Sequence, residues 1–249
     1  MGPVRGGATG ARQFAVRRFD LRRAAGFAIN VALRRQTQTK SMHATPASRR
    51  VFLVSLLPAA VAVRRALAAD GGASPTAVMQ RFYDALLSEM KEAKRLTFDQ
   101  RYQRIAPAVT QSYNLPLMSR LAVGPSWANL APAQQQSITD AFSRYTISVY
   151  ANRFDDYNGE RFDVDPNPAN SPNGQIVQTA LIKSNGEKVL LNYLMRQGES
   201  GWQVIDVYLS GTISQLATQR SEYSAVLQQG GADALVKLLD QRIASLRSG

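Results

Sequence analysis

The spacing of apolar residues changes twice along the chain, and this change is the strongest constraint on its fold. Apolar residues recur at helical spacing up to about residue 155 and return to it beyond residue 212. Between residues 175 and 209 they alternate or run continuously, after a Pro/Asn-rich segment, 165–173, that indicates a loop. Helices, then an antiparallel sheet, then helices indicate a single α+β domain.

The helical segments have recognisable starts and stops. Ser74 and Pro75 offer an N-cap and a first-turn proline for a helix that runs to about Lys94. Gly230-Gly231 separates the last two helices. Beyond the first helix, the expected helices span about 98–110, 114–124, 132–155, 212–228 and 233–246.

The alternating part predicts a three-stranded antiparallel meander. Residues 175–183 and 187–196 flank Asn185-Gly186, a dipeptide that strongly favours a two-residue hairpin turn. The third strand covers residues 201–209, and residues 160–165 are a candidate fourth strand.

The middle strand is apolar on both faces. Leu190 and Leu194 lie on one face beside polar residues, whereas a sheet with one wet face would alternate more cleanly. Either helices cover both faces or one face lines an apolar cavity. The fully apolar face carries Val189, Leu191, Tyr193 and Met195.

The net charge of +12 comes entirely from the N-terminal quarter of the chain. Residues 1–68 carry 13 of the 30 Lys and Arg and one of the 18 Asp and Glu, which leaves 17 of each sign in residues 69–249. A nucleic-acid-binding domain needs a basic patch of its own. The neutral body therefore argues against nucleic acid as a partner.

Residues 42–68 have the order of a secretory signal peptide. A basic stretch precedes the apolar run Val51–Val63, and Ala66-Leu67-Ala68 offers a small-residue cleavage site. The run is shorter than the about 20 residues that span a membrane. We expect an exported, periplasmic protein that is cleaved near Ala68, with residues 69–249 as one mature domain.

The start of the signal resembles the twin-arginine export signal in the stretch from Ser48 through Arg49-Arg50 to Leu53. Such a signal exports folded proteins, and the basic pair Arg64-Arg65 fits that route. The alternative is an ordinary signal that happens to contain two arginines. We interpret residues 1–41 as a mis-assigned start or an extra leader.

The mature domain has neither histidine nor cysteine, because the only histidine is His43. It therefore lacks the usual base of serine and cysteine nucleophiles, the usual zinc ligands and any disulfide. Ser88 and Lys91 match a serine acyl-enzyme pattern but lie within a helix without its partner motifs. The acidic run from Asp155 to Asp165 lacks the spacing of a calcium loop. We expect no enzyme, no cofactor and no metal.

Four short motifs mark the C-terminal third, and Gly124 and Trp127 continue the pattern upstream. The motifs are Gly201-Trp202 with Asp206-Val207, Gly211-Thr212-Ile213-Ser214, Arg220-Ser221-Glu222-Tyr223, and Gly230 through Leu235. Together they resemble the MlaC/toluene-tolerance family. The family usually has its glycine directly before the Ile/Val–Ser pair. This departure, with the twin-arginine leader, resembles the hopanoid-associated HpnM branch.

The resemblance implies a curved NTF2-like sheet closed by helices around an apolar cavity. It implies a periplasmic carrier that moves a phospholipid or hopanoid-type lipid between the inner and outer membranes, with only transient membrane contact. An inner-membrane transporter complex, and as a further candidate an outer-membrane complex, would be its partners. Our candidate lining residues, each equally compatible with ordinary core, are Leu117, Leu121, Tyr145, Val149, Leu191, Tyr193, Val207 and Leu209.

Three points stay open at this level. Arg220 and Asp206 are expected to form an internal ion pair, with headgroup contact as the alternative. An NTF2-like proton-transfer enzyme could use Asp206 and Tyr208, which alternate onto one face of a strand. A structural adaptor would dock a transporter subunit and carry no lipid.

Overall fold

The computed structural model describes residues 73–248, so the expectations for residues 1–41 and 42–68 lie outside the described residues. Its helical elements are α2 (Pro75–Glu92), η1 (Ala93–Arg95), α3 (Phe98–Ser112), α4 (Leu115–Val123), η2 (Gly124–Asn129), α5 (Pro132–Arg153) and α6 (Gln215–Arg247). Its strands are β1 (Arg161–Val164), β2 (Ala169–Ser171), β3 (Gly174–Val177), β4 (Thr179–Ile182), β5 (Lys188–Gly198), β6 (Gly201–Leu209) and β7 (Ile213–Ser214).

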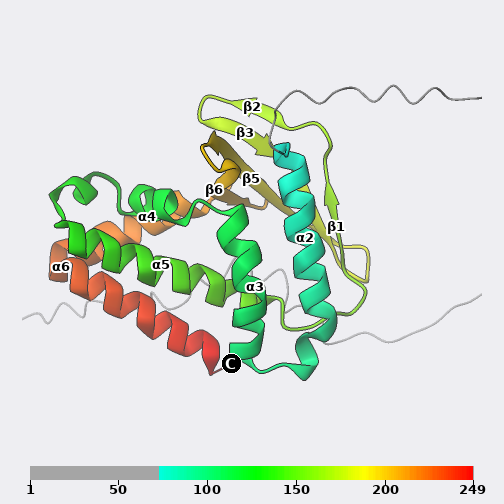
Figure 1. The fold of residues 1–249 in the computed structure, drawn as a ribbon, viewed down its shortest axis with the longest axis horizontal. Helices are drawn as coiled ribbons and strands as arrows, with labels where there is room; N and C mark the ends of the chain where they lie inside the picture. The colour runs from blue at the N-terminus through cyan, green and yellow to red at the C-terminus, as the bar shows by residue number, and fades with distance from the viewer. Residues whose placement is uncertain (1–72, 249) are drawn as a thin grey trace, which may run out of the picture.

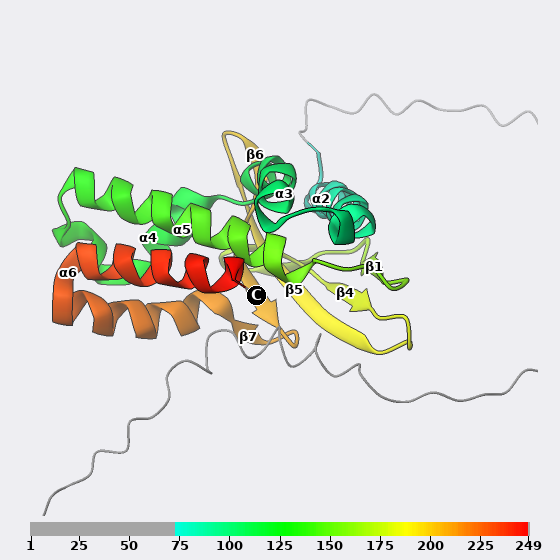
Figure 2. The ribbon, with the colours of Figure 1, turned by 90° about the horizontal axis from the view of Figure 1, so that it is seen from below.

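The helices form two groups around the sheet. Helices α2 and α3 lie side by side over one face of the sheet, whereas α4, α5 and α6 form a bundle beyond its end (Figures 1 and 2). Helix α6 doubles back on itself, because Gly231 takes φ 69° and ψ −165° in its middle. The expected break at Gly230-Gly231 is therefore confirmed, and it produces two antiparallel segments.

Side-chain caps explain where three of the helices begin. The Ser74 hydroxyl accepts a hydrogen bond from the Ala77 amide at 3.2 Å at the start of α2. Thr97 and Gln100 form a reciprocal capping box at the start of α3. Ser214 caps α6 by accepting from the backbone amide of Ala217 at 2.9 Å. Each cap satisfies a backbone amide that the helix itself leaves without a partner.

Strand β5 is the centre of the sheet. On one side it pairs with β3 and β4, and on the other side with β6. Val177 lies opposite Tyr193 and Ala180 opposite Leu190, so β3 and β4 keep one register and only Gln178 separates them. The single strand expected over residues 175–183 is thus one bent strand. The Asn185-Gly186 turn joins it to β5 as expected, with Gly186 at φ 85°.

The outer strand β6 is protected along its edge. A register shift at Leu194/Met195 leaves one extra residue in β6, which is a β-bulge. The Asn114 amide donates to the Val204 carbonyl at 3.0 Å, so the connection between α3 and α4 crosses this edge. Strand β7 pairs with the other end of β6. Such cover prevents another chain from adding to the sheet there.

Two short strands were not expected from the sequence. Strand β2 lies inside the Pro/Asn-rich segment that we expected to be a loop, and β7 lies where we expected the start of a helix. With three and two residues, neither is long enough to show alternation. Their pairing with β3 and β6 creates them. The expected order of helices, antiparallel sheet and helices is otherwise confirmed.

Gly174 provides a test of this sheet geometry. A Cβ at this position would lie 2.0 Å from the Met195 carbonyl oxygen, and its φ of +144° suits glycine. We expect Gly174→Ala to lower the free energy of unfolding by about 2 kcal/mol or more, measured by urea unfolding. Gly198→Ala is the matched control, because no atom lies within 4 Å of its added Cβ. Equal stability of the two variants would contradict this register.

Candidate functional site

The face of the sheet that points toward the helices is a continuous apolar wall. Leu191 lies opposite Leu209, and Tyr193 opposite Val207, on adjacent strands β5 and β6. Leu191, Tyr193 and Leu209 are buried and Val207 is half-buried against the same core. Val189 and Met195 also contact this core. Four of the eight expected lining residues therefore come together, on the face that the alternation predicts.

The other four expected lining residues lie on the helices. Leu121 on α4 and Tyr145 on α5 are half-buried and pack against the core. The Tyr145 ring lies 5.9 Å from the Arg242 guanidinium, so it contacts α6. Leu117 and Val149 are half-buried outside the contiguous core. That these four residues line a cavity remains a prediction. They lie on α4 and α5, in the helical bundle.

Four tyrosines meet between the wall and the helices, and we refer to Tyr83, Tyr113, Tyr150 and Tyr193 as the tyrosine cluster. Tyr150 is half-buried, and the other three are buried. The Tyr83 hydroxyl donates to the Tyr193 hydroxyl at 3.0 Å, and the Tyr113 and Tyr150 hydroxyls form a hydrogen bond with each other. The Tyr83 hydroxyl also lies 2.6 Å from Thr179 Oγ1. The cluster thus joins α2, the end of α3, α5 and β5.

Phenylalanine rings pack around the cluster. Phe162 of β1 stacks on Tyr83 with a centroid distance of 4.2 Å, and Phe154 stacks on Tyr150 at 5.7 Å. Phe82 meets Tyr150 edge-on at 5.2 Å. The distances to Tyr150 fall in the range in which aromatic pairs stabilise a core beyond the area that they bury, and the Phe162–Tyr83 stack is slightly closer. Aromatic rings therefore fill the space between the sheet and helices α2, α3 and α5.

Burial controls the ionisation of these hydroxyls. It raises the pKa of Tyr83 above the usual value, and it raises the pKa of Tyr113, Tyr150 and Tyr193 well above it, because the phenolate would lose its hydration. All four are neutral near pH 7. They act as hydrogen-bonding groups and not as bases or nucleophiles.

Of this cluster, the sequence predicts only Tyr193 as a site residue. Tyr150 lies in a helical segment beside other apolar residues, and Tyr83 follows directly after the apolar Phe82. Tyr113 lies in the short connection between two helices, where no periodicity applies. The sequence signal for this cluster is the presence of tyrosines at positions where a core would normally have phenylalanine or leucine. The sequence does not show that these tyrosines meet, because that depends on tertiary packing.

The expected ion pair between Arg220 and Asp206 is wrong. The Asp206 carboxylate accepts from the Leu216 amide at 3.1 Å and from the Ser214 hydroxyl at 2.5 Å, at the N-terminus of α6. Arg220 Nε instead donates to the Leu121 carbonyl oxygen at 2.9 Å, at the C-terminus of α4. Each charged group has found the helix end of opposite partial charge, which is a favourable arrangement for both.

This arrangement also argues against the proton-transfer enzyme. The Asp206 carboxylate accepts a third hydrogen bond, from the Val207 amide at 2.7 Å. Leu194 pairs with Asp206 across the strands and Asn192 with Tyr208, so both residues alternate away from the apolar wall. A catalytic base would need a carboxylate that faces the apolar pocket, and Asp206 is instead held by three hydrogen bonds on the other face.

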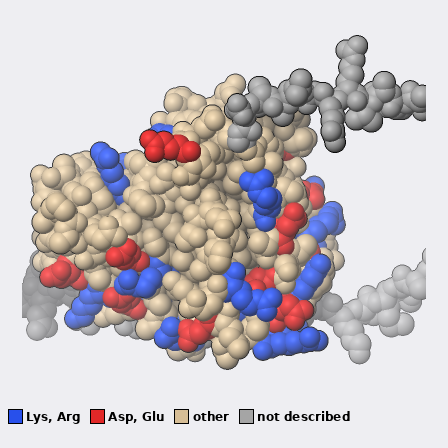
Figure 3. All heavy atoms as spheres, in the orientation of Figure 1, with Lys and Arg blue, Asp and Glu red and all other residues tan. Residues whose placement is uncertain are grey.

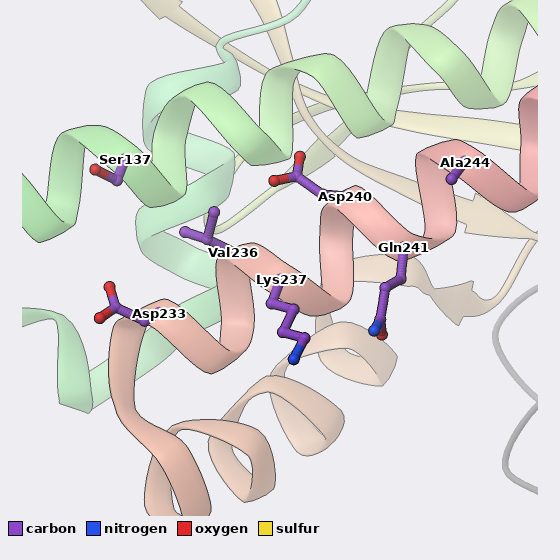
Figure 4. Close-up of a pocket in the computed structure, with 7 residues that line it drawn as sticks. All are labelled: Ser137, Asp233, Val236, Lys237, Asp240, Gln241 and Ala244. Atoms are coloured by element: carbon purple, nitrogen blue, oxygen red, sulfur yellow. The ribbon is translucent and has the colours of Figure 1, made fainter.

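A hollow at the surface lies between α5 and the second half of α6 (Figure 4). Its volume is about 500 Å³, and charged groups such as Asp233, Lys237 and Asp240 line it. Hydrated charges oppose the burial of hydrocarbon. The hollow is therefore a poor site for an apolar ligand.

The charges of the described surface have no single dominant sign. Acidic and basic side chains are interspersed on the face that Figure 3 shows, and Arg120 is the only charged residue between residues 115 and 138. Within residues 73–248 there is no group of three His, Cys, Asp or Glu side chains placed to hold a metal. No helix in that range has the length and apolar character to cross a membrane.

The fold is an α+β fold in which helices cover an open antiparallel sheet, and the apolar wall lies between them. Residues 80–241 match the sequence family described as MlaC protein. The chain belongs to the MlaC family. Its members are periplasmic lipid-binding carriers and not enzymes, so the expectation of a non-enzymatic protein is confirmed.

A solved structure supports the same fold. The chain is similar to a phospholipid-binding protein from Ralstonia solanacearum that was solved in complex with a phospholipid. The TM-score is 0.62 at 25% sequence identity, and the match covers 70% of this chain and 99% of that chain. The expected NTF2-like architecture is confirmed by this likeness.

The tyrosine cluster predicts an alkaline limit of stability. An unfolded tyrosine loses its proton near pH 10, whereas the buried hydroxyls keep theirs to higher pH. Above about pH 10 the unfolded state therefore binds fewer protons, and the free energy of unfolding must fall as the pH rises. We expect tyrosinate absorbance and loss of circular dichroism to develop together. Ionisation of all nine tyrosines in a chain that stays folded would contradict this account.

Proposed function

We propose that this chain is a periplasmic carrier that shelters a lipid against the wall of β5 and β6. The observation that carries the proposal is the apolar wall of Leu191, Tyr193, Val207 and Leu209 in a chain of the MlaC family. The phospholipid bound to the similar Ralstonia solanacearum protein supports a lipid as cargo. A hopanoid-type lipid is the alternative cargo, supported by the HpnM-like position of Gly211.

The physical need for such a carrier is large. Each methylene of an acyl chain costs about 0.8 kcal/mol to expose to water, so two chains cost on the order of 20 kcal/mol. A chamber that removes these chains from water needs apolar walls more than catalytic groups. Beside the wall residues Leu191, Tyr193, Val207 and Leu209, the proposed lining set includes Leu117 and Leu121 of α4 and Tyr145 and Val149 of α5.

The packing supports one way of accommodating a lipid. The rings of the tyrosine cluster and of Phe82 and Phe162 occupy the space between the wall and α2. A lipid chain therefore requires that α2 and α3 move away from the sheet. The partners that could receive the lipid are an inner-membrane transporter complex and an outer-membrane complex, each touched only transiently.

One observation favours a second function, that of a structural adaptor. The same aromatic packing gives a filled core, and a protein with a filled core could dock a transporter subunit without any cargo. Lipid content of the purified protein separates the two functions.

Leu191 gives the first test of the chamber. We expect Leu191→Trp to reduce the lipid recovered per mole of protein while the fold survives, because the larger ring occupies space that cargo needs. We expect Leu191→Ala in the lipid-loaded protein to cost less than the about 2–5 kcal/mol typical of a buried leucine, because cargo instead of packed side chains then lies against this part of the wall. Thermal unfolding and mass spectrometry of extracted lipid measure the two effects.

Leu235→Ala is the matched control, because Leu235 is fully buried within α6 and away from the wall. It should show the full loss of a core leucine. If Leu191→Trp unfolds the protein and the folded fraction keeps a normal lipid content, Leu191 is ordinary core. If the unmodified protein carries no lipid, the adaptor function is favoured.

The leader gives a test of export. We propose that residues 42–68 are a twin-arginine signal, that residues 1–41 are an extra leader or a mis-assigned start, and that the mature domain spans 69–249. Replacing Arg49 and Arg50 together by Lys should abolish the periplasmic form, whose N-terminus should lie within a few residues of Ala69. Normal periplasmic levels of the double variant, in cells with an intact general secretory route, would indicate ordinary secretion.

A further inference from the structure

The hydroxyls of the tyrosine cluster are not needed to fill the core. A phenylalanine would supply the same ring, and a buried hydroxyl is unfavourable unless it is hydrogen-bonded. Tyr223 illustrates the contrast, because its buried hydroxyl has no hydrogen-bond partner among the described residues. Four hydroxyls gathered at one point form a polar spot at the centre of an otherwise aromatic space.

The cluster spans the walls that a lipid would have to separate. Tyr83 belongs to α2 and Tyr193 to β5, so their 3.0 Å hydrogen bond joins a helix directly to the sheet. The bond between Tyr113 and Tyr150 joins the end of α3 to α5. A chain inserted between α2 and the sheet breaks the first of these bonds. Each freed hydroxyl then faces hydrocarbon, unless the inserted molecule offers it a partner.

We propose that the tyrosine cluster is a polar recognition site inside the lipid chamber, which donates hydrogen bonds to an oxygen atom carried within the apolar body of the cargo. The inference rests on the proposed carrier function and specifies the chemistry of its ligand. The hydroxyl of Tyr83 is freed first, because it donates to Tyr193 across the opening and lies 2.6 Å from Thr179 Oγ1 of the sheet.

The chemistry of the site selects an acceptor. A neutral tyrosine hydroxyl donates one proton, and Thr179 Oγ1 already donates to the Leu191 carbonyl oxygen within the sheet. Two kinds of lipid carry an uncharged oxygen acceptor next to their apolar part. One is the ester carbonyl at the neck of a phospholipid, and the other is the hydroxyl of a polycyclic alcohol. A pure hydrocarbon or a lipid without such an oxygen leaves the freed hydroxyls unpaired.

The test is a competition between matched lipids on the exported protein. Vesicles present equal amounts of a diester phosphatidylcholine and its diether analogue, with the same headgroup and chain lengths but no carbonyl. A second pair is cholestanol and cholestane, which differ by one hydroxyl. Mass spectrometry of the purified protein counts each lipid bound.

We expect the oxygen-bearing member of at least one pair to be favoured about fivefold, the factor that one net hydrogen bond contributes to an equilibrium. Preference within the phosphatidylcholine pair assigns the acceptor to an ester, and preference within the sterol pair assigns it to a hydroxyl. Tyr83→Phe should reduce the preference toward parity while total lipid stays bound. Tyr223→Phe is the matched control, because it removes a buried hydroxyl outside the cluster, and it should keep the preference.

Measurements on the unmodified protein are sufficient to overturn the inference. If both members of both pairs bind equally and lipid is clearly bound, the cluster does not recognise a lipid oxygen. The proposed carrier function is then unaffected. A preference that survives in Tyr83→Phe and in Tyr150→Phe places the recognition elsewhere. Absence of any bound lipid removes the carrier function and the inference together.

Discussion

The double pairing of β5 is the interaction on which the rest of the structure depends. The strand bonds to β3 and β4 on one side and to β6 on the other, so it joins the two halves of the sheet along most of its length. This fixes Leu191 and Tyr193 on a single face, and Leu209 and Val207 are fixed beside them. A slip of one residue would turn the whole wall to the other face. The shared register of β3 and β4 and the tight approach at Gly174 both oppose such a slip.

The helices attach to this sheet through polar as well as apolar contacts. A purely apolar interface would tolerate many packings of similar energy, whereas a hydrogen bond such as that between Tyr83 and Tyr193 is satisfied in few of them. The tyrosines therefore specify how α2 lies on the sheet. The same helices are held to one another at the surface by pairs such as Arg104–Glu89, where the carboxylate is buried. A small number of hydrogen bonds and ion pairs therefore selects one packing of the helices on the sheet.

The sequence predicted the architecture well because periodicity and turn chemistry are local. Asn185-Gly186 identified the hairpin, and Gly230-Gly231 identified the reversal in the last helical region. The sequence predicted half of the proposed site, since Leu191, Tyr193, Val207 and Leu209 follow from strand alternation alone. What it missed depends on distant contacts. Nothing local distinguishes Tyr83 from any other helical tyrosine, and the Asp206–Arg220 pair failed because both charges are satisfied by helix ends.

The reversal at Gly231 has a consequence for the timing of folding. The second half of α6 packs along α5, and Leu235 and Leu239, in the last fifteen residues of the chain, are fully buried. The very end is fastened as well, because Arg247 pairs with Asp99 of α3 and the Leu246 carbonyl accepts from Asn152 of α5. The core therefore lacks one of its walls until the second half of α6 has packed against it. The apolar surfaces of α4 and α5 stay in contact with water or chaperones until this segment arrives, so the closure of the core is a late step in the folding of the domain.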